Sequence, residues 1–374
     1  MTTNERDGGK RTGWTKRDVR AVNDALPPPH DGLDDEPSAE SARGASPRAT
    51  SRLDNTGSFD AATIARHAEM LANRVKKTQR KLGARMERDA VGAYRLYDRD
   101  IPEVRVFVEW YEGHLVLAEY EREQTGEAYL PELARVLGAA LGLPETHVHA
   151  RRRHARHARE SRGARPSAPA TRLVARERLA RFAVRLGVDA DTGLFPHLRN
   201  VRTRVAAESA GKRVLDLFSY TGSFGVAAVQ GGARELSSVD PSQLHLDWAA
   251  ENFVLNRVDP AAHPLYRDDV RAFLADAGEA VERWDLAVLD TSSFSVRLGA
   301  DGEPLDVLRD HRALIVETLA VLEPGAVLWF VTSHQRFIPD LDGLRAREVV
   351  EQTATTVPDD YRNREIHRAW RLVK

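Results

Sequence analysis

The sequence predicts an α/β protein whose C-terminal half is a parallel sheet covered by helices on both faces, preceded by a smaller α/β unit. Short apolar segments typical of buried parallel strands alternate with helical segments from Arg213 onward. A glycine-containing turn joins the first of these strands directly to a helix. The 374 residues suffice for two folded units, since a domain commonly has about 100 to 200 residues.

The composition is that of a globular protein without a membrane-spanning segment. Hydrophobic residues make up 42% and charged residues 30% of the chain, and no apolar run approaches the roughly 20 residues of a transmembrane helix. The polar start lacks the apolar core of a secretory signal, so we expect a cytoplasmic protein. The chain has no cysteine, which excludes disulfides, thiolate zinc sites and cysteine nucleophiles, and no residue is assigned to a metal site.

Residues 1–57 are predicted to form a disordered tail, because apolar residues are too sparse there for any secondary-structure period. Order is expected from residue 58, where a helix carries apolar residues on one face and a basic run on the other. The following sequence predicts strands near residues 94–97, 104–110 and 115–120 and a helix near residues 129–141.

A dense arginine cluster ends this first unit. Residues 151–165 hold seven arginines and two histidines against one glutamate, although the net charge of the whole chain is only −1. The cluster is either a solvated loop or a segment that contacts phosphates, because arginine forks match phosphate oxygens. We favour phosphate contact and interpret residues 58–165 as an α/β RNA-binding region, with contacts from the basic helix and the cluster: Arg74, Lys77, Arg151, Arg152, Arg153 and Arg156.

A β-hairpin linker is expected at residues 166–200, with its strands between Thr171 and Leu186. The first strand of the parallel sheet then spans residues 213–218 and runs into a tight turn at residues 219–225. Such a turn brings backbone N–H groups to the N-terminus of the next helix, the arrangement that nucleotide-type ligands use in doubly wound folds.

Acidic residues lie at the ends of successive strands. Asp216 is in the first strand, Asp240 ends the second strand 24 residues later, and Asp269 and Asp290 end the third and fourth. A fifth strand is expected at residues 326–331. Because the carboxyl ends of parallel strands share one edge of the sheet, the four carboxylates are expected to meet there around a ligand.

These acids have a second interpretation, since Asp240 and Asp269 also suit helix caps and turns. The spacing of the set favours a cofactor site, in which Asp240 can accept both ribose hydroxyls. A dehydrogenase would share that acid but normally shows G-x-G-x-x-G after the first strand. Here the turn has no pyrophosphate cradle, so we predict S-adenosylmethionine, with Asp216 near its amino group and contacts from Phe218, Ser219, Tyr220, Thr221 and Gly222.

Several segments, in order from about residue 65 to the C-terminus, carry a family resemblance: LANR at 71–74, YRLYD at 94–98, DTGLF at 191–195, LFSYTGS at 217–223, GGAR at 231–234, VD at 239–240, DGL at 342–344 and RNREIH at 362–367. Together they resemble the 23S ribosomal RNA guanine-N7 methyltransferase domain. The resemblance implies a Rossmann-like class I methyltransferase domain at residues 201–374 that uses S-adenosylmethionine. It also implies cofactor contacts from Phe195, Asp216, Asp240, Asp269 and Asp290.

Two motifs depart from that family. Its usual Asp-Pro-Pro-Thr-Phe is Asp290-Thr291-Ser292-Ser293-Phe294 here, and its usual Asp-His-Arg is His197-Leu198-Arg199. Losing two prolines adds backbone donors and conformational freedom to the first loop. We retain Asp290 and Phe294 as the catalytic candidates, with Phe294 either stacking on an extruded base or packing in the core, and we assign Arg199 to RNA contact.

The acceptor atom decides which groups the chemistry needs. Guanine N7 has a free lone pair and needs no base, an exocyclic amine must be oriented and deprotonated, and cytosine C5 needs a cysteine that this chain lacks. The sequence therefore favours in-line transfer to guanine N7 of 23S ribosomal RNA, free or in an assembling large subunit. Two alternatives stay open: a related methyltransferase with a changed acceptor, and a catalytically silent RNA-binding homologue. The sequence does not predict the oligomeric state.

Overall fold

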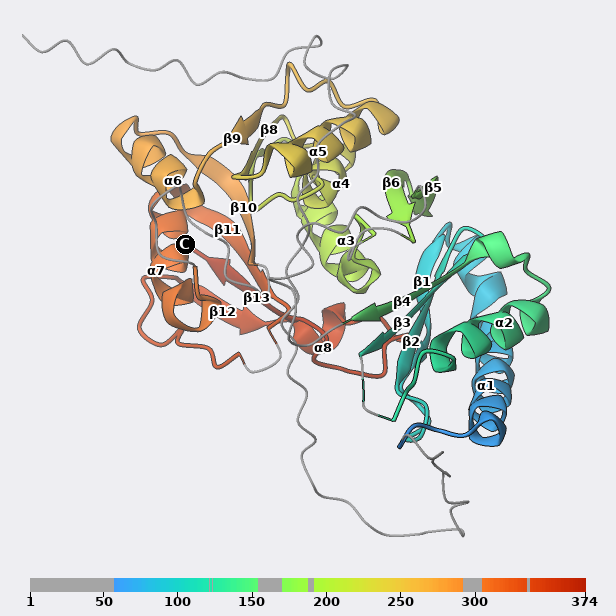
Figure 1. Cartoon of the computed structure of the whole chain (residues 1–374). Coiled ribbons are helices and arrows are strands. Elements are labelled where there is room, and N and C mark those ends of the chain that lie inside the picture. The colour runs from blue at the N-terminus through green and yellow to red at the C-terminus, as the bar shows by residue number, and fades with distance from the viewer. Residues whose placement is uncertain are drawn as a thin grey trace, which may run out of the picture.

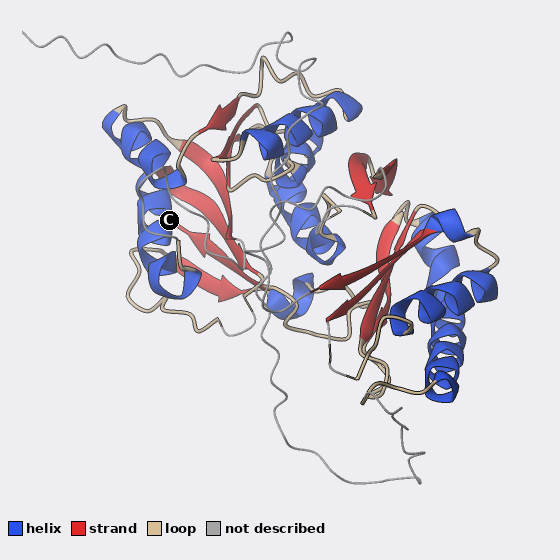
Figure 2. Ribbon diagram, in the orientation of Figure 1, coloured by secondary structure: helices blue, strands red, loops and turns tan. Residues whose placement is uncertain are grey.

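The computed structural model describes residues 57–120, 122, 124–153, 170–187, 192–291, 305–334 and 337–374. Residues 1–56 of the predicted tail lie outside these ranges, as do Arg156 and Phe294. Figures 1 and 2 show two α/β units of different size with a small hairpin between them. None of the helices in the described ranges is long and apolar enough to cross a membrane.

The N-terminal unit is a four-stranded sheet with two helices on one face (Figure 1). The strands are in the order β1-β2-β3-β4, with β3 and β4 parallel and the other pairs antiparallel. Asp60 begins the first helix by accepting a hydrogen bond from the Thr63 backbone N–H. The elements are α1 (Ala61–Arg88), β1 (Ala93–Asp98), β2 (Val106–Tyr111), β3 (His114–Tyr120), α2 (Tyr129–Leu141), the 3₁₀ turn η2 (Glu145–His147) and β4 (Val148–Arg153).

Strand β4 was not expected from the sequence. It includes Arg151, Arg152 and Arg153, so the arginine cluster begins in a strand paired with β3 and not in a loop. The alternation of side chains in a strand therefore decides which way each of these arginines points.

A hairpin and a short loop connect the two units. Strands β5 (Thr171–Glu177) and β6 (Ala180–Leu186) pair antiparallel, as the linker prediction expects. The loop after them contains the 3₁₀ turn η3 (Pro196–Leu198) and leads into α3 (Arg199–Glu208).

The C-terminal unit is a seven-stranded sheet in the order β12-β13-β11-β10-β7-β8-β9. Strands β7 to β11 pair in parallel, as the sequence predicts, whereas β13 pairs antiparallel with both of its neighbours. The last two strands were missing from the prediction. The elements are β7 (Arg213–Leu217), α4 (Ser223–Gln230), β8 (Glu235–Asp240), α5 (Gln243–Leu255), β9 (Leu265–Arg267), α6 (Val270–Glu279), β10 (Trp284–Thr291), α7 (Val307–Ala320), β11 (Leu322–Thr332), β12 (Glu348–Glu351), α8 (Thr353–Thr356) and β13 (Arg368–Val373).

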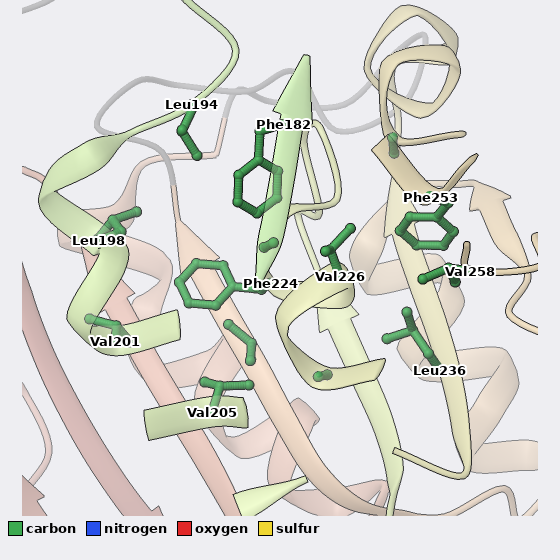
Figure 3. Close-up of a cluster of buried hydrophobic side chains, with 14 of the residues drawn as sticks. Phe182, Leu194, Leu198, Val201, Val205, Phe224, Val226, Leu236, Phe253 and Val258 are labelled. Atoms are coloured by element: carbon green, nitrogen blue, oxygen red, sulfur yellow. The ribbon is translucent and has the colours of Figure 1, made fainter. Parts of the chain in front are cut away.

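Both faces of the central strands of this sheet are buried. Along β10, Leu286 and Val288 face the layer formed by the hairpin and α3 to α5, whereas Ala287 and Leu289 face α6 and α7. Figure 1 shows these two helical layers on opposite sides of the sheet, and Figure 3 shows the first layer with labelled side chains from the hairpin, α3, α4 and α5. The strands of the central sheet are therefore apolar on both sides, which explains why their sequence segments are continuously hydrophobic.

The two units are joined through buried polar contacts. The Tyr361 hydroxyl donates to Glu109 at 3.1 Å, and the Asp98 carboxylate accepts from the backbone N–H of Arg362 at 3.0 Å. The Asp360 carboxylate, at the centre of this junction, accepts from the Arg95 backbone N–H at 2.9 Å. The segment before β13 thus fixes the N-terminal sheet against the C-terminal unit.

Candidate functional site

The turn between β7 and α4 has an unusual backbone. Phe218, Tyr220 and Gly222 all have positive φ, at 55°, 49° and 72°. A Cβ on Gly222 would lie 2.9 Å from the Ala249 Cβ and 3.0 Å from a ring carbon of Phe253, so the close approach of α5 requires glycine there. Two strained non-glycine residues in one turn are typical of a functional site.

Asp216 lies beneath this turn and is almost completely buried, with 1% of its surface exposed. One carboxylate oxygen, Oδ2, accepts from the Gly225 backbone N–H at 3.0 Å, and the other, Oδ1, is buried without a hydrogen-bond partner. Burial, with a smaller contribution from the nearby Asp290, raises the pKa of Asp216 to about 8. An unpartnered buried acceptor of this kind calls for a donor from a ligand.

Asp290 lies at the carboxyl end of β10 and is partly exposed. Desolvation raises its pKa to about 7, and the positive charge of Arg202 opposes this rise. The next residue, Thr291, still belongs to the strand, and its hydroxyl donates to the Val331 carbonyl at 3.2 Å. The threonine thus continues the ladder where a proline would lack the N–H group.

Asp240 ends β8 as predicted, and its carboxylate is already engaged. Oδ2 accepts from the Tyr220 backbone N–H at 2.9 Å, and Oδ1 accepts from the Ser242 N–H at 2.9 Å. The His245 Nδ1 lies 3.0 Å from the same Oδ1. Asp240 therefore fixes the glycine-containing turn and keeps only part of its accepting capacity for a ligand.

Asp269 combines two of the roles considered from the sequence. Its Oδ1 caps α6 by accepting from the N–H groups of Arg271 at 2.9 Å and Ala272 at 3.1 Å. Its Oδ2 is buried without a partner. The capping interpretation is thus true for one oxygen, and the second oxygen is left available for a ligand.

An aromatic wall lines the same edge of the sheet. The rings of Phe195 and Tyr220 stack with centroids 5.5 Å apart, and His245 meets Tyr220 edge to face at 4.6 Å. The loop that carries Phe195 is tied to the turn, because the Thr221 hydroxyl donates to the Gly193 carbonyl at 2.7 Å. Thr221 and Phe195, far apart in the sequence, therefore belong to one site.

The residues at this edge suit a cationic nucleoside. Buried acceptors without partners come from Asp216 and Asp269, and the Ser219 hydroxyl is a third buried polar group without one. Desolvation raises the pKa values of Asp216 and Asp290, so a cation beside them would favour their ionised forms. A sulfonium and an ammonium group would supply the missing positive charge, and an adenosine would supply donors and an aromatic face.

The RNA-contact candidates have different surroundings. Lys77 is exposed on α1, and Arg74, also exposed, pairs with Asp100. Arg151 is half-buried on β4, as is Arg152, whose guanidinium donates to the Gly126 carbonyl and lies 3.7 Å from Glu119. Of Arg153 only the backbone is described, in the same strand.

Arg199 does not have the role expected from the sequence. Only 5% of its surface is exposed, and its guanidinium forms an ion pair with the fully buried Asp360 side chain. The arginine therefore stabilises the junction between the two units and has no free donor face for RNA.

A second buried arginine, which the sequence analysis missed, lies beside the site. Arg202 on α3 pairs with Glu177 on β5 at 2.6 Å, donates to the Phe195 carbonyl at 3.0 Å and contacts the Ser223 hydroxyl at 3.5 Å. It thereby links the hairpin, the Phe195 loop and the first residue of α4. No sequence signal points to it, because its carboxylate partner is 25 residues away on a separate element.

Comparison with known proteins gives concordant results. The family model for S-adenosylmethionine-dependent methyltransferases matches residues 100–353. Ribosomal RNA large subunit methyltransferase K of Neisseria meningitidis is 35% identical over 308 residues, covering 80% of this chain and 86% of that protein. Ribosomal RNA large subunit methyltransferase K/L of Hahella chejuensis is 34% identical over 83% of this chain, which spans only 43% of that longer relative.

Among solved structures, a protein assigned as a methyltransferase and crystallised with SAH has a TM-score of 0.65 at 21% identity and covers 82% of each chain. A protein from Streptococcus mutans assigned as a SAM-dependent methyltransferase also has a TM-score of 0.65, at 20% identity. At these identities the likeness shows the shared fold.

Proposed function

Because this chain belongs to the family of S-adenosylmethionine-dependent methyltransferases that includes ribosomal RNA large subunit methyltransferase K, we propose that it methylates guanine N7 in 23S ribosomal RNA. The observation that carries this proposal is the edge of the parallel sheet, where buried acidic oxygens without partners adjoin a glycine-containing turn. The substrate class rests on the relatives, whose names assign them to ribosomal RNA of the large subunit.

Four carboxylates would surround the cofactor, and three of them have assigned partners on it. Asp216 Oδ1 would accept from the methionine amino group, Asp240 from the ribose hydroxyls and Asp269 Oδ2 from the adenine amino group. This assignment is supported by the unpartnered oxygens of Asp216 and Asp269. Phe195 and Tyr220, which stack on each other, would cover the nucleoside together with the turn residues Phe218, Ser219, Thr221 and Gly222.

The cofactor supplies a methyl group bonded to a positively charged sulfur. The protein has to align the guanine lone pair with that carbon and exclude water, because in-line displacement depends chiefly on orientation. Guanine N7 carries no proton, so no general base is needed and no bond to the enzyme forms. Asp290, at the mouth of the site, would orient the base through a hydrogen bond, and Phe294 would stack on it.

The environment of Asp290 suits hydrogen bonding to the edge of a base. A carboxyl with a pKa of about 7 is only partly ionised near neutral pH. The positive charge of the bound cofactor would favour the ionised form, in which the carboxylate accepts hydrogen bonds from the N–H groups of a base edge. An exocyclic amine would in addition require removal of a proton, a step that guanine N7 avoids.

The proposal is tested by mapping N7-methylguanine in 23S ribosomal RNA from cells with the gene, without it, and with the Asp216→Asn variant. Borohydride reduction followed by aniline cleaves RNA at N7-methylguanine, so one gene-dependent cleavage that Asp216→Asn abolishes is expected. A labelled methyl group in RNA without such a cleavage would mean a changed acceptor atom. No cofactor binding by calorimetry would mean a silent RNA-binding homologue.

A further inference from the structure

The β5–β6 hairpin carries arginines that are not among the residues of the cofactor site. Between Thr171 and Leu186 there are five arginines and one glutamate, and that glutamate, Glu177, is neutralised internally by Arg202. Arg176 is also paired, with Glu112 at 2.9 Å. The remaining basic side chains of the hairpin include Arg172 and Arg181, both exposed to solvent.

The hairpin forms an open-sided pocket with α5. Its volume is about 140 Å³, and its lining combines aliphatic side chains with two arginines and one glutamate: Arg172, Leu173, Val174, Ala183, Val184, Arg185, Glu251 and Leu255. Val174 in this lining is 41% exposed, and Val254, next to Leu255 on α5, is 58% exposed. Apolar surface flanked by arginine is the combination that unstacked nucleotides bind, because the base needs an apolar face and the phosphate needs a cation.

The pocket is linked to the cofactor site through two packed side chains, those of Arg185 and Trp248. The Arg185 guanidinium lies 4.0 Å from the centre of the Trp248 ring, and that ring is 6.4 Å from Tyr220. The Arg185 backbone N–H also donates to the Thr192 carbonyl at 3.1 Å, at the start of the loop that carries Phe195. A strand lying across the pocket would therefore pass close to the aromatic wall.

We infer that the β5–β6 hairpin and the adjoining face of α5 dock the RNA strand next to the target guanine. Arg172 and Arg181 contact its phosphates, and the pocket takes one unstacked nucleotide. This inference rests on the proposed function, since it requires an RNA substrate. Charge complementarity favours RNA over a protein partner, because the exposed arginines flank the apolar surface on the hairpin itself.

The test compares two double charge reversals that change the net charge equally. One is Arg172→Glu with Arg181→Glu. The matched control is Arg345→Glu with Arg347→Glu, two exposed arginines next to β12, an edge strand of the seven-stranded sheet. Each variant is assayed for cofactor affinity, for the KM and kcat of methyl transfer to a 23S ribosomal RNA fragment, and for the salt dependence of RNA binding.

The hairpin variant is expected to raise the KM for RNA at least tenfold while cofactor affinity stays unchanged. The slope of log K against log salt is expected to flatten by about 0.7 for each phosphate that the variant no longer neutralises. Val174→Asp, at the rim of the pocket, is expected to raise the KM for RNA without changing kcat. Arg172→Ala alone serves as a milder variant if the double reversal unfolds.

Three outcomes would overturn the inference. The first two are an unchanged KM and salt slope in the hairpin variant, and an equal effect in the control variant. The third is a loss of methyl transfer that occurs only with ribosomal particles, while the hairpin variant binds naked RNA normally. The last outcome would indicate a protein partner at the hairpin. A wild-type protein that methylates no RNA would instead contradict the proposed function, so the two failures are distinguishable.

Discussion

Arg202 and Glu177 form a buried ion pair at 2.6 Å, and the same guanidinium donates to the Phe195 carbonyl. The side chains of the pair are 1% and 6% exposed, so neither charge is solvated by water. The pair fixes the Phe195 loop against α4 through contacts that no single element could make. Mutation can therefore separate the effect of this ion pair on the free energy of unfolding from its effect on cofactor affinity.

Replacing Glu177 by Gln leaves the Arg202 charge buried with a neutral partner. The free energy of unfolding is expected to fall by about 3 to 5 kcal/mol, as for other buried pairs that lose one member. Cofactor affinity is expected to fall as well, because Arg202, which anchors the Phe195 loop, loses the carboxylate that positions its guanidinium. Urea unfolding and calorimetry measure the two effects.

The matched control for this variant is Arg95→Lys, which weakens another buried cluster of charges, with Asp98 and Glu109. It is expected to lower stability without changing cofactor affinity. An equal loss of affinity in both variants would mean that Arg202 acts through stability alone.

Asp216→Asn is expected to abolish cofactor binding and to stabilise the free protein at alkaline pH. The pKa of Asp216 is about 8 in the folded state and about 3.9 in an unfolded chain, so the native state binds the extra proton between these values. The contribution of Asp216 protonation to the free energy of unfolding is therefore complete below about pH 4 and is lost as the pH rises through about 8. Asp216→Asn has no titratable group at this position, so its stability does not fall for this reason as the pH rises.

The measurement is urea unfolding of the wild type and Asp216→Asn at pH 5 and pH 8.5. Between pH 5 and pH 8.5 the wild type is expected to lose about 4 kcal/mol of stability relative to the variant, because each of the roughly three pH units up to the folded-state pKa corresponds to about 1.4 kcal/mol. A difference that does not change with pH would show that Asp216 is ionised throughout.

Cofactor affinity is expected to depend on pH. Asp216 and Asp290 must be ionised to attract a cation, and their pKa values are about 8 and 7 in the free protein. Binding should therefore release about one proton between pH 8 and 7 and about two below pH 7, so affinity should fall by up to about tenfold per pH unit in the first range and by up to about a hundredfold per unit in the second. Calorimetry in buffers of different ionisation enthalpy measures the released protons.

SAH is the control ligand for this experiment, because its sulfur is uncharged. It is expected to bind with a weaker dependence on pH than S-adenosylmethionine. Identical pH profiles for the two ligands would show that the carboxylates do not respond to the sulfonium charge.

Asp240→Asn is expected to weaken cofactor binding by about 10-fold to 100-fold, the effect of losing one charge-assisted hydrogen bond. Part of this loss would come from the turn, because Asp240 also holds the Tyr220 N–H. His245→Gln, which removes only the neighbouring imidazole, is the control and should change affinity much less. A full effect from His245→Gln would assign the binding energy to the aromatic wall instead.

The sequence determined the parallel sheet and the positions of its acids. Strands β7 to β10 and the turn at Gly222 were predicted within a few residues, because buried parallel strands are continuously apolar and their carboxyl ends share one edge. The α/β fold, the methyltransferase family and the cofactor were confirmed by the comparisons. Which residues bind cofactor and RNA remains a prediction.

Tertiary structure alone decided the surroundings of each charge. Arg199 and Arg202 both look like ordinary arginines of a basic helix, yet both are buried in ion pairs with residues from other elements. The arginine cluster begins in β4 because β3 offers it a parallel partner, which no local pattern reveals. The pKa of Asp216 follows from burial and from Asp290 on another strand, and such distances exist only once the chain has folded.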